Sequence, residues 1–206
     1  MTPRPHDLLR LSAAAAWALP SDAPSWTRGV LRTAPWVVVR RATAPAGFVA
    51  AGIRGADRSH RYAWLVSSDD IQTTLAPEDL ADVRALVGRD VPAIVALPKA
   101  RELLGEARFP WGPTGSVGFE LATGIPTATS DSDLDLLVRV DQLGAAALAR
   151  LTTLYERLGH LGVRVDCQVD TPVGAIALAE LVSESNEVLV RTPSGPRLVE
   201  RAAAVG

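Results

Sequence analysis

Several short segments of this chain are rich in apolar residues and bounded by polar or turn residues, and one of them, residues 163–169, alternates apolar with polar residues. Both patterns predict β-strands. Outside the acidic centre of the sequence, the clearest runs are residues 36–41, 48–53, 61–67 and 163–169. The first two runs flank a Pro-Ala-Gly sequence at 45–47, which favours a tight turn, so we predict a β-hairpin there. A Pro-Ser-Gly sequence at 193–195 predicts the turn of a second hairpin near the C-terminus.

Other segments show the spacing of a helix. Apolar residues recur at every third or fourth position between 143 and 158, with Asp141 before them as an expected N-cap and Gly159 after them. We also predict helices for residues 77–87, which begin with proline and end before a glycine, and for residues 174–182. Because strands and helices are mixed along the chain, the pattern predicts the α+β class.

The length of 206 residues permits one large or two small domains. We expect a boundary between Gly88 and Pro92, which would separate a small N-terminal α/β module, residues 1–88, from a second domain, residues 89–206. With 48% hydrophobic and 21% charged residues, the composition is that of an ordinary globular protein with a real core.

Charge and cysteine content narrow the possible functions. The net charge of −2 argues against a protein that coats nucleic acid, because such a protein needs a basic surface, and it favours a small molecule or a protein as substrate. The single cysteine, Cys167, excludes an internal disulfide and fits a reducing compartment. It alternates with Asp166 along a predicted strand, so we expect a buried structural thiol.

An apolar, alanine-rich segment at residues 11–19 imitates the hydrophobic part of a secretory signal. The segment is too short to cross a bilayer, and Asp7 interrupts the basic residues that precede it. We therefore expect it to belong to the folded protein, and we predict a cytoplasmic location without membrane contact.

The most informative segment is residues 129–138, where acidic residues alternate with apolar ones. On a strand, Asp133 and Asp135 would share one face, with their Cα atoms roughly 6.6 Å apart, while Leu134 would point to the other face. Two carboxylates this close repel each other unless a cation binds them, and oxygen ligands together with a phosphate partner are typical of Mg²⁺. The alternative is ordinary turn chemistry of Ser and Asp, which accounts better for Asp131.

A second motif lies upstream, at Gly115 and Ser116. The glycines and Pro113 predict a turn, and the apolar residues that follow can begin a short helix, so the Gly-Ser amides would lie at a helix N-terminus. Such amides bind anions, glycine allows a phosphate to approach closely, and the serine hydroxyl can add a hydrogen bond. A Gly-Ser pair alone is weak support for a phosphate site, but together with the aspartate pair it becomes moderately specific.

These motifs carry a family resemblance. A Gly-Ser pair, a short helix and a Ser-Asp-Leu-Asp-Leu strand resemble the DNA polymerase beta-type nucleotidyltransferase superfamily. Together with residues 4–9, 111–124 and 165–172, they resemble the malonate decarboxylase holo-acyl-carrier-protein synthases, also called phosphoribosyl-dephospho-CoA transferases. The resemblance implies a nucleotidyltransferase-like mixed sheet with flanking helices. It also implies transfer of phosphoribosyl-dephospho-CoA from triphosphoribosyl-dephospho-CoA to a serine of the acyl-carrier subunit, with release of diphosphate.

The superfamily resemblance also implies a third carboxylate on a neighbouring strand. In the run 163–169 and the residue after it, Arg164, Asp166, Gln168 and Asp170 share one face. We predict Asp166 as the third carboxylate, either as a ligand of a second metal ion or as the general base, with Asp170 as the runner-up. Both could instead belong to a solvated sheet face.

Because the chain has one lysine and twenty arginines, any phosphate clamp is expected to use guanidinium groups. We predict Arg54, Arg58 and Arg61 as substrate-binding residues, although a solvated charged loop explains them as well. Two other functions stay open from the residues: a nucleotidyltransferase acting on another small-molecule or nucleotide acceptor, and an inactive nucleotide-binding regulatory module.

Overall fold

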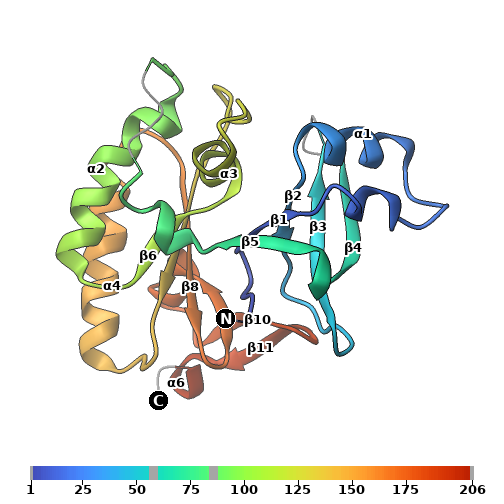
Figure 1. Cartoon of the computed structure of the whole chain (residues 1–206). Coiled ribbons are helices and arrows are strands. Elements are labelled where there is room, and N and C mark those ends of the chain that lie inside the picture. The colour runs from blue at the N-terminus through green and yellow to red at the C-terminus, as the bar shows by residue number, and fades with distance from the viewer. Residues whose placement is uncertain (1, 56–59, 84–87, 205–206) are drawn as a thin grey trace. The chain divides into compact units, whose positions relative to one another are not determined.

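The computed structural model of the chain describes residues 2–55, 60–83 and 88–204. The chain divides into two compact units, Met1–Ala76 and Pro77–Gly206 (Figure 1). This division falls at Ala76 rather than near Gly88, where the sequence predicts a boundary. The reason is that the short 3₁₀ helix η3 (Pro77–Leu80) packs against β6 (Trp111–Pro113) and α3 (Gly115–Thr123), which are elements of the second unit.

The first unit is built on a five-stranded sheet in the order β4-β3-β2-β1-β5. Its strands are β1 (Leu8–Leu11), β2 (Trp36–Val39), β3 (Phe48–Arg54), β4 (Arg61–Ser67) and β5 (Ile71–Leu75). The predicted hairpin, β2–β3, and the predicted strand 61–67, β4, are confirmed. All neighbouring strands are antiparallel and need no crossover helix, so the unit is α+β rather than the α/β module expected.

The core of the first unit lies between this sheet and the elements η1 (Ala15–Trp17) and α1 (Ser25–Thr33). Leu11, Ala15 and Leu19 are buried in this core. The expectation that the apolar segment 11–19 belongs to the folded protein is therefore confirmed. Among the residues that the structure describes, no helix is long and apolar enough to cross a membrane.

The second unit is built on a six-stranded mixed sheet in the order β11-β10-β9-β8-β7-β6. Besides β6, its strands are β7 (Leu134–Arg139), β8 (Val165–Thr171), β9 (Gly174–Ala177), β10 (Glu187–Thr192) and β11 (Gly195–Glu200). The β7 and β8 strands are parallel, whereas the other neighbours are antiparallel. The strands β10 and β11 form the predicted C-terminal hairpin.

Two long helices, α2 (Pro92–Ala107) and α4 (Ala145–Leu158), lie side by side in this unit and bury one face of the sheet (Figure 1). The helix α4 confirms the predicted leucine repeat, and Leu151, Leu154 and Leu158 are buried. It begins after Gly144 rather than at an Asp141 cap. The helix α2 was not predicted from the pattern of apolar residues.

Two predicted helices differ from the structure. In the segment 77–87, the described residues form only η3 and a turn, and residues 84–87 lie outside the described residues. In the segment 174–182, the first half is the strand β9, and only α5 (Leu178–Leu181) is helical. Gly174 has a φ of 141°, which lets the chain turn back tightly so that β9 pairs with β8. A last short helix, α6 (Arg201–Ala204), ends the described chain.

Candidate active site

The two central aspartates lie where the strand β7 begins. Asp135 is within the strand and half-buried, and Asp133 precedes it with a side chain that is 26% exposed. Leu134 and Leu136 point to the opposite face, where they are buried against the helices. The predicted alternation is therefore confirmed, and it leaves both carboxylates on the face away from α2 and α4.

The neighbouring strand brings the third predicted aspartate to the same place. In the parallel pairing of β7 with β8, Asp135 lies directly opposite Asp166. Residues opposite each other on neighbouring strands point to the same face and have Cα atoms about 5 Å apart. Asp166 is exposed, so its carboxylate is accessible from solvent beside that of Asp135. The structure thus places these two residues side by side on one face of the sheet, whereas their catalytic roles stay predictions.

The Gly-Ser motif contacts this pair directly. Gly115 is the first residue of α3 and has a φ of 58°, and a Cβ atom added to it would lie 1.7 Å from Oδ2 of Asp135. The backbone N–H of Thr114 donates to the carbonyl oxygen of Asp135, with an N···O distance of 2.9 Å. Only glycine leaves room for the Asp135 carboxylate against this turn. The predicted helix N-terminus at residues 115 and 116 is confirmed, and Ser116 is buried.

Glu120, which the sequence analysis did not single out, holds the loop that leads to Asp133. Its buried carboxylate accepts hydrogen bonds from Arg89, at 2.7 Å, and from the backbone N–H groups of Thr127 and Ala128, both at 2.9 Å. Burial alone would raise the pKa of Glu120, but the Arg89 guanidinium and the two N–H groups outweigh it and hold the pKa below its ordinary value. The sequence offered one signal for this role, because Glu120 is the single acidic residue in the otherwise apolar segment that forms α3.

Asp170, the runner-up for the third carboxylate, has a structural partner. Its Oδ2 accepts a hydrogen bond from Nη1 of Arg139, whose Nε donates to Oε1 of Glu78. Arg139 is 9% exposed, so this network holds a buried cation between η3 and the two central strands. The network explains Asp170 without a catalytic role and leaves Asp166 as the carboxylate nearer to Asp135.

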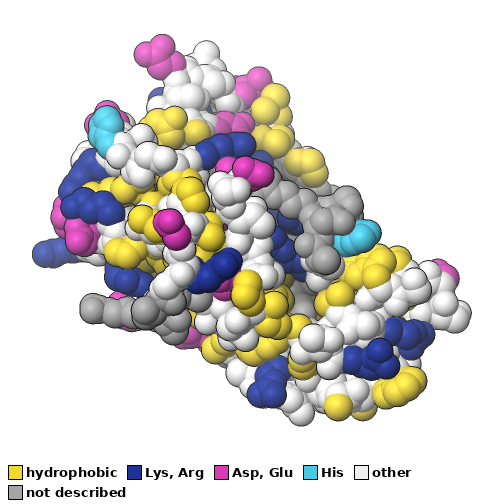
Figure 2. Space-filling model, turned by 90° about the horizontal axis from the view of Figure 1, so that it is seen from above, with side chains coloured by type: hydrophobic (Ala, Val, Ile, Leu, Met, Phe, Trp, Pro, Cys, Tyr) yellow, Lys and Arg dark blue, Asp and Glu magenta, His cyan; other side chains and the backbone are white. Residues whose placement is uncertain are grey.

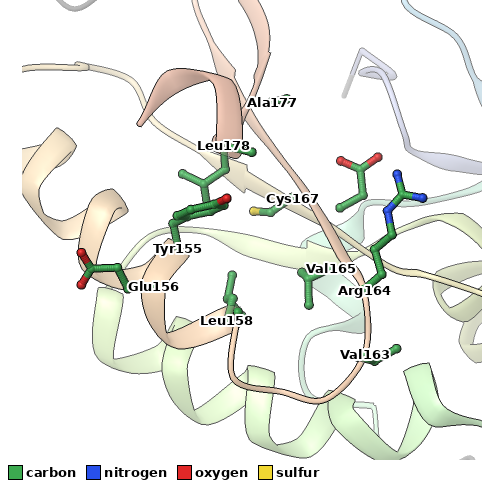
Figure 3. A pocket seen from close by; sticks show the side chains of 12 residues that line it. Tyr155, Glu156, Leu158, Val163, Arg164, Val165, Cys167, Ala177 and Leu178 are labelled. Atoms are coloured by element: carbon green, nitrogen blue, oxygen red, sulfur yellow. The ribbon is translucent and has the colours of Figure 1, made fainter. Parts of the chain in front are cut away.

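A cavity of about 370 Å³ opens between α4, β8 and α5, lined by Tyr155, Leu158, Val165 and Leu178 among others (Figure 3). Arg164 and Asp166 are also among the lining residues. Cys167 is another lining residue. Burial and then the Asp166 charge raise the pKa of its thiol to about 12, so the thiol stays protonated. The expectation of a buried thiol is confirmed.

Two of the three predicted arginines of the first unit lie at one end of the β3–β4 hairpin. Arg54 and Arg61 lie opposite each other where β3 pairs with β4, whereas Arg58 lies outside the described residues. The ring of His60 stacks on Trp26, with centroids 5.3 Å apart. On the face shown in Figure 2, basic and acidic side chains are interspersed over the described residues. Substrate binding by these arginines stays a prediction.

The donor atoms fit a hard cation better than a soft one. Within residues 2–55, 60–83 and 88–204, no three His, Cys, Asp or Glu side chains form a preassembled metal group. The three predicted aspartates therefore do not make a closed cage. Asp133 and Asp135 offer carboxylate oxygens, and Gly115 at the N-terminus of α3 lies against Asp135. Few carboxylates together with phosphate and water is the usual environment of Mg²⁺. The carboxylate oxygens are thus of the donor type that suits Mg²⁺, and binding of this ion stays a prediction.

Comparisons with known proteins agree along the whole chain. Residues 4–77 match the family model described as phosphoribosyl-dephospho-CoA transferase MdcG N-terminal domain. Residues 79–202 match the model described as phosphoribosyl-dephospho-CoA transferase MdcG C-terminal domain. The junction between the two matches coincides with the division between the two compact units.

Individual relatives carry the same description. A phosphoribosyl-dephospho-CoA transferase from Pseudomonas putida is 44% identical over 203 residues, which cover 98% of this chain and 96% of the relative. A protein of that name from Pseudomonas aeruginosa strain PAO1 is 39% identical over 199 residues, covering 96% of this chain and 92% of the relative. No solved structure matches the chain.

Proposed function

The chain belongs to the phosphoribosyl-dephospho-CoA transferase family, and from this premise we propose its donor, its acceptor and its catalytic residues. The donor is triphosphoribosyl-dephospho-CoA, and the acceptor is a serine of the acyl-carrier subunit of malonate decarboxylase. Diphosphate is released, and the second unit works in the manner of a nucleotidyltransferase. The transferred group follows from the family, whereas the triphosphate donor and the carrier serine belong to the proposal.

One observation carries the assignment of the site. Asp135 lies opposite Asp166 on adjacent parallel strands, and its carboxylate fills the space that a Cβ atom of residue 115 would take. The arrangement joins two carboxylates to a helix N-terminus whose amides can bind phosphate. A triphosphate is the ligand that needs both features, because it carries the charge that a metal neutralises and the oxygens that amides bind.

In the proposed reaction the serine Oγ attacks the α-phosphorus, the bond from that phosphorus to the diphosphate breaks, and the serine proton moves to Asp166. Asp133 and Asp135 would hold Mg²⁺, which lowers the charge on the triphosphate and on the departing diphosphate when it is bound. The amides at Gly115 and Ser116 orient the outer phosphates, which keeps the leaving group aligned with the nucleophile. If Asp166 instead holds a second ion, the proton leaves through water.

The proposal is tested by incubating the full-length enzyme with triphosphoribosyl-dephospho-CoA, Mg²⁺ and the carrier subunit, and by measuring the intact mass of the carrier. We expect a mass increase of one phosphoribosyl-dephospho-CoA group and an equal amount of diphosphate. A carrier with alanine at the acceptor serine should gain nothing, and Asp135→Asn enzyme should give no adduct. Transfer from ATP but not from the proposed donor would instead indicate another nucleotidyltransferase.

A further inference from the structure

Arg164 lies beside the carboxylate site and has a mostly exposed side chain. It directly precedes β8, and its carbonyl oxygen accepts a hydrogen bond of 2.9 Å from the backbone N–H of Leu134, so its backbone is fixed next to Asp133. Figure 3 shows its side chain on the side of β8 opposite to Val165 and Cys167. This is the face of the sheet that carries Asp166, two residues further along.

The contact between Arg164 and Asp133 is weak. Nη1 of Arg164 lies 3.6 Å from Oδ2 of Asp133, and the arginine side chain is 79% exposed. This separation is too long for a hydrogen bond, and exposed ion pairs of this kind add little to stability. Other arginines of the unit differ: Arg89 is fixed by a short hydrogen bond to the buried Glu120, and Arg139, itself buried, by a short hydrogen bond to Glu78. Arg164 can therefore leave Asp133 at little cost.

The position of Arg164 is better suited to binding a phosphate than to stabilising the fold. A triphosphate that approaches Asp133, Asp135 and Asp166 meets three negative charges, and a guanidinium beside them reduces this repulsion. A guanidinium also presents planar pairs of N–H donors that match phosphate oxygens. The backbone of Arg164 is fixed next to Asp133, and its side chain is exposed. The guanidinium can therefore turn from Asp133 to a phosphate without movement of the backbone.

We propose that Arg164 exchanges partners during binding: it pairs with Asp133 in the free enzyme and with phosphate oxygens of the donor once Mg²⁺ occupies the carboxylates. This inference rests on the proposed function. It assigns a further substrate-binding residue within the second unit. It also requires two effects of opposite sign when the guanidinium is removed, because Arg164 competes with Mg²⁺ for Asp133 but attracts the triphosphate.

The test measures binding rather than activity. Titration calorimetry of the full-length enzyme gives the affinity for Mg²⁺ alone and then for inorganic triphosphate at saturating Mg²⁺. In Arg164→Gln we expect Mg²⁺ to bind up to about fivefold more tightly, the range for loss of an exposed ion pair. We expect triphosphate to bind at least about tenfold more weakly, because a hydrogen bond to a charged group is lost. Arg164→Lys should recover part of the triphosphate affinity, since it keeps the charge but not the planar donors.

A matched control is Arg157→Gln, because Arg157 also forms an exposed ion pair, with Glu106 of α2. This variant should leave both binding constants unchanged. If Arg164→Gln weakens Mg²⁺ binding or leaves the triphosphate affinity at the wild-type value, the proposed role of Arg164 is wrong. If the wild-type enzyme transfers the group but binds neither Mg²⁺ nor triphosphate, the proposed metal site fails together with this inference. Normal wild-type binding of both probes, with no change in Arg164→Gln, would overturn the inference alone.

Discussion

At position 115 the carboxylate of Asp135 fills the space in which any other amino acid would carry its Cβ atom. We expect Gly115→Ala to abolish most of the turnover, because Asp135 must move away from its place opposite Asp166. The left-handed backbone at this position, with a φ of 58°, should also cost about 1–2 kcal/mol of stability when alanine adopts it. Turnover in the carrier assay and the free energy of unfolding in urea measure the two effects separately.

Gly105 provides the matched control for this substitution. It lies within α2, and an added Cβ atom would meet no atom within 4 Å. Gly105→Ala should keep full turnover and raise the free energy of unfolding by up to about 1 kcal/mol, because alanine favours a helix. Wild-type turnover in Gly115→Ala would show that the Asp135 carboxylate does not need its observed place.

The two aspartates on β8 are expected to respond differently to the same change. Asp166→Asn should lower turnover by at least ~10²-fold, the lower range for a positioned general base, and leave stability unchanged because the side chain is exposed. Asp170→Asn should change turnover only modestly but lower the free energy of unfolding by about 1.5–3 kcal/mol, because Arg139 loses a charged hydrogen-bond partner. Steady-state kinetics and urea unfolding of both variants distinguish the roles, and the reverse pattern would move the third carboxylate to Asp170.

At the scale of elements, Glu120 ties the helix α3 to the loop that leads into β7. The pKa of its carboxyl is held below the ordinary value of 4.5, so ionised Glu120 stabilises the folded protein. This contribution is complete above about pH 4.5 and is lost as the pH falls through the lower, folded-state pKa. Glu120→Gln should therefore lower the free energy of unfolding at pH 7 by about 1.5–3 kcal/mol.

The same variant should also have a flatter pH dependence of stability. Urea unfolding between pH 7 and about pH 3 should show a smaller loss of stability for Glu120→Gln than for the wild-type enzyme, with the difference confined to the range below about pH 4.5. Parallel curves for the two proteins would mean that Glu120 has the same pKa in the folded and unfolded states.

Local chemistry explains which elements were predictable. The hairpin β2–β3 and the strand β4 follow from short apolar runs and turn residues, which act over a few neighbours in the chain. The helix α2 was missed because Pro98 lies inside it, and its stability comes from packing against α4. The strand β9 was mistaken for helix because a short apolar run fits either state until its pairing partner is known.

The candidate site shows the same limit. Alternation correctly placed Asp133 and Asp135 on one face, and the glycine next to Ser116 correctly predicted a helix N-terminus. The pairing of Asp135 with Asp166 depends on the register between two strands, which no local pattern fixes. Glu120 and Arg164 were not identified as part of the site because their roles arise only from contacts across the fold.

At the scale of the whole molecule, the division at residue 76 determines where the second unit can be separated. The segment η3 supplies Glu78 to the buried Arg139, and the carbonyl oxygen of Pro77 lies where a Cβ atom at Gly112 would be, 1.8 Å away. A fragment of residues 77–206 keeps these contacts. A fragment of residues 89–206, cut at the boundary that the sequence predicts, loses these contacts, including the hydrogen bond from Arg139 to Glu78.

We therefore expect the fragment 77–206 to unfold cooperatively in urea and the fragment 89–206 to be less stable by about 3–5 kcal/mol or not to fold, because the buried guanidinium of Arg139 loses a carboxylate partner and the other contacts of η3 are lost with it. Glu78→Gln in the longer fragment isolates this pair from the other contacts of η3, and it should account for only part of the difference. Circular dichroism during urea unfolding compares the three proteins. Equal stability of the two fragments would show that η3 is dispensable and that the second unit begins near residue 89, because the contacts of Glu78 and Pro77 would then contribute nothing to its fold.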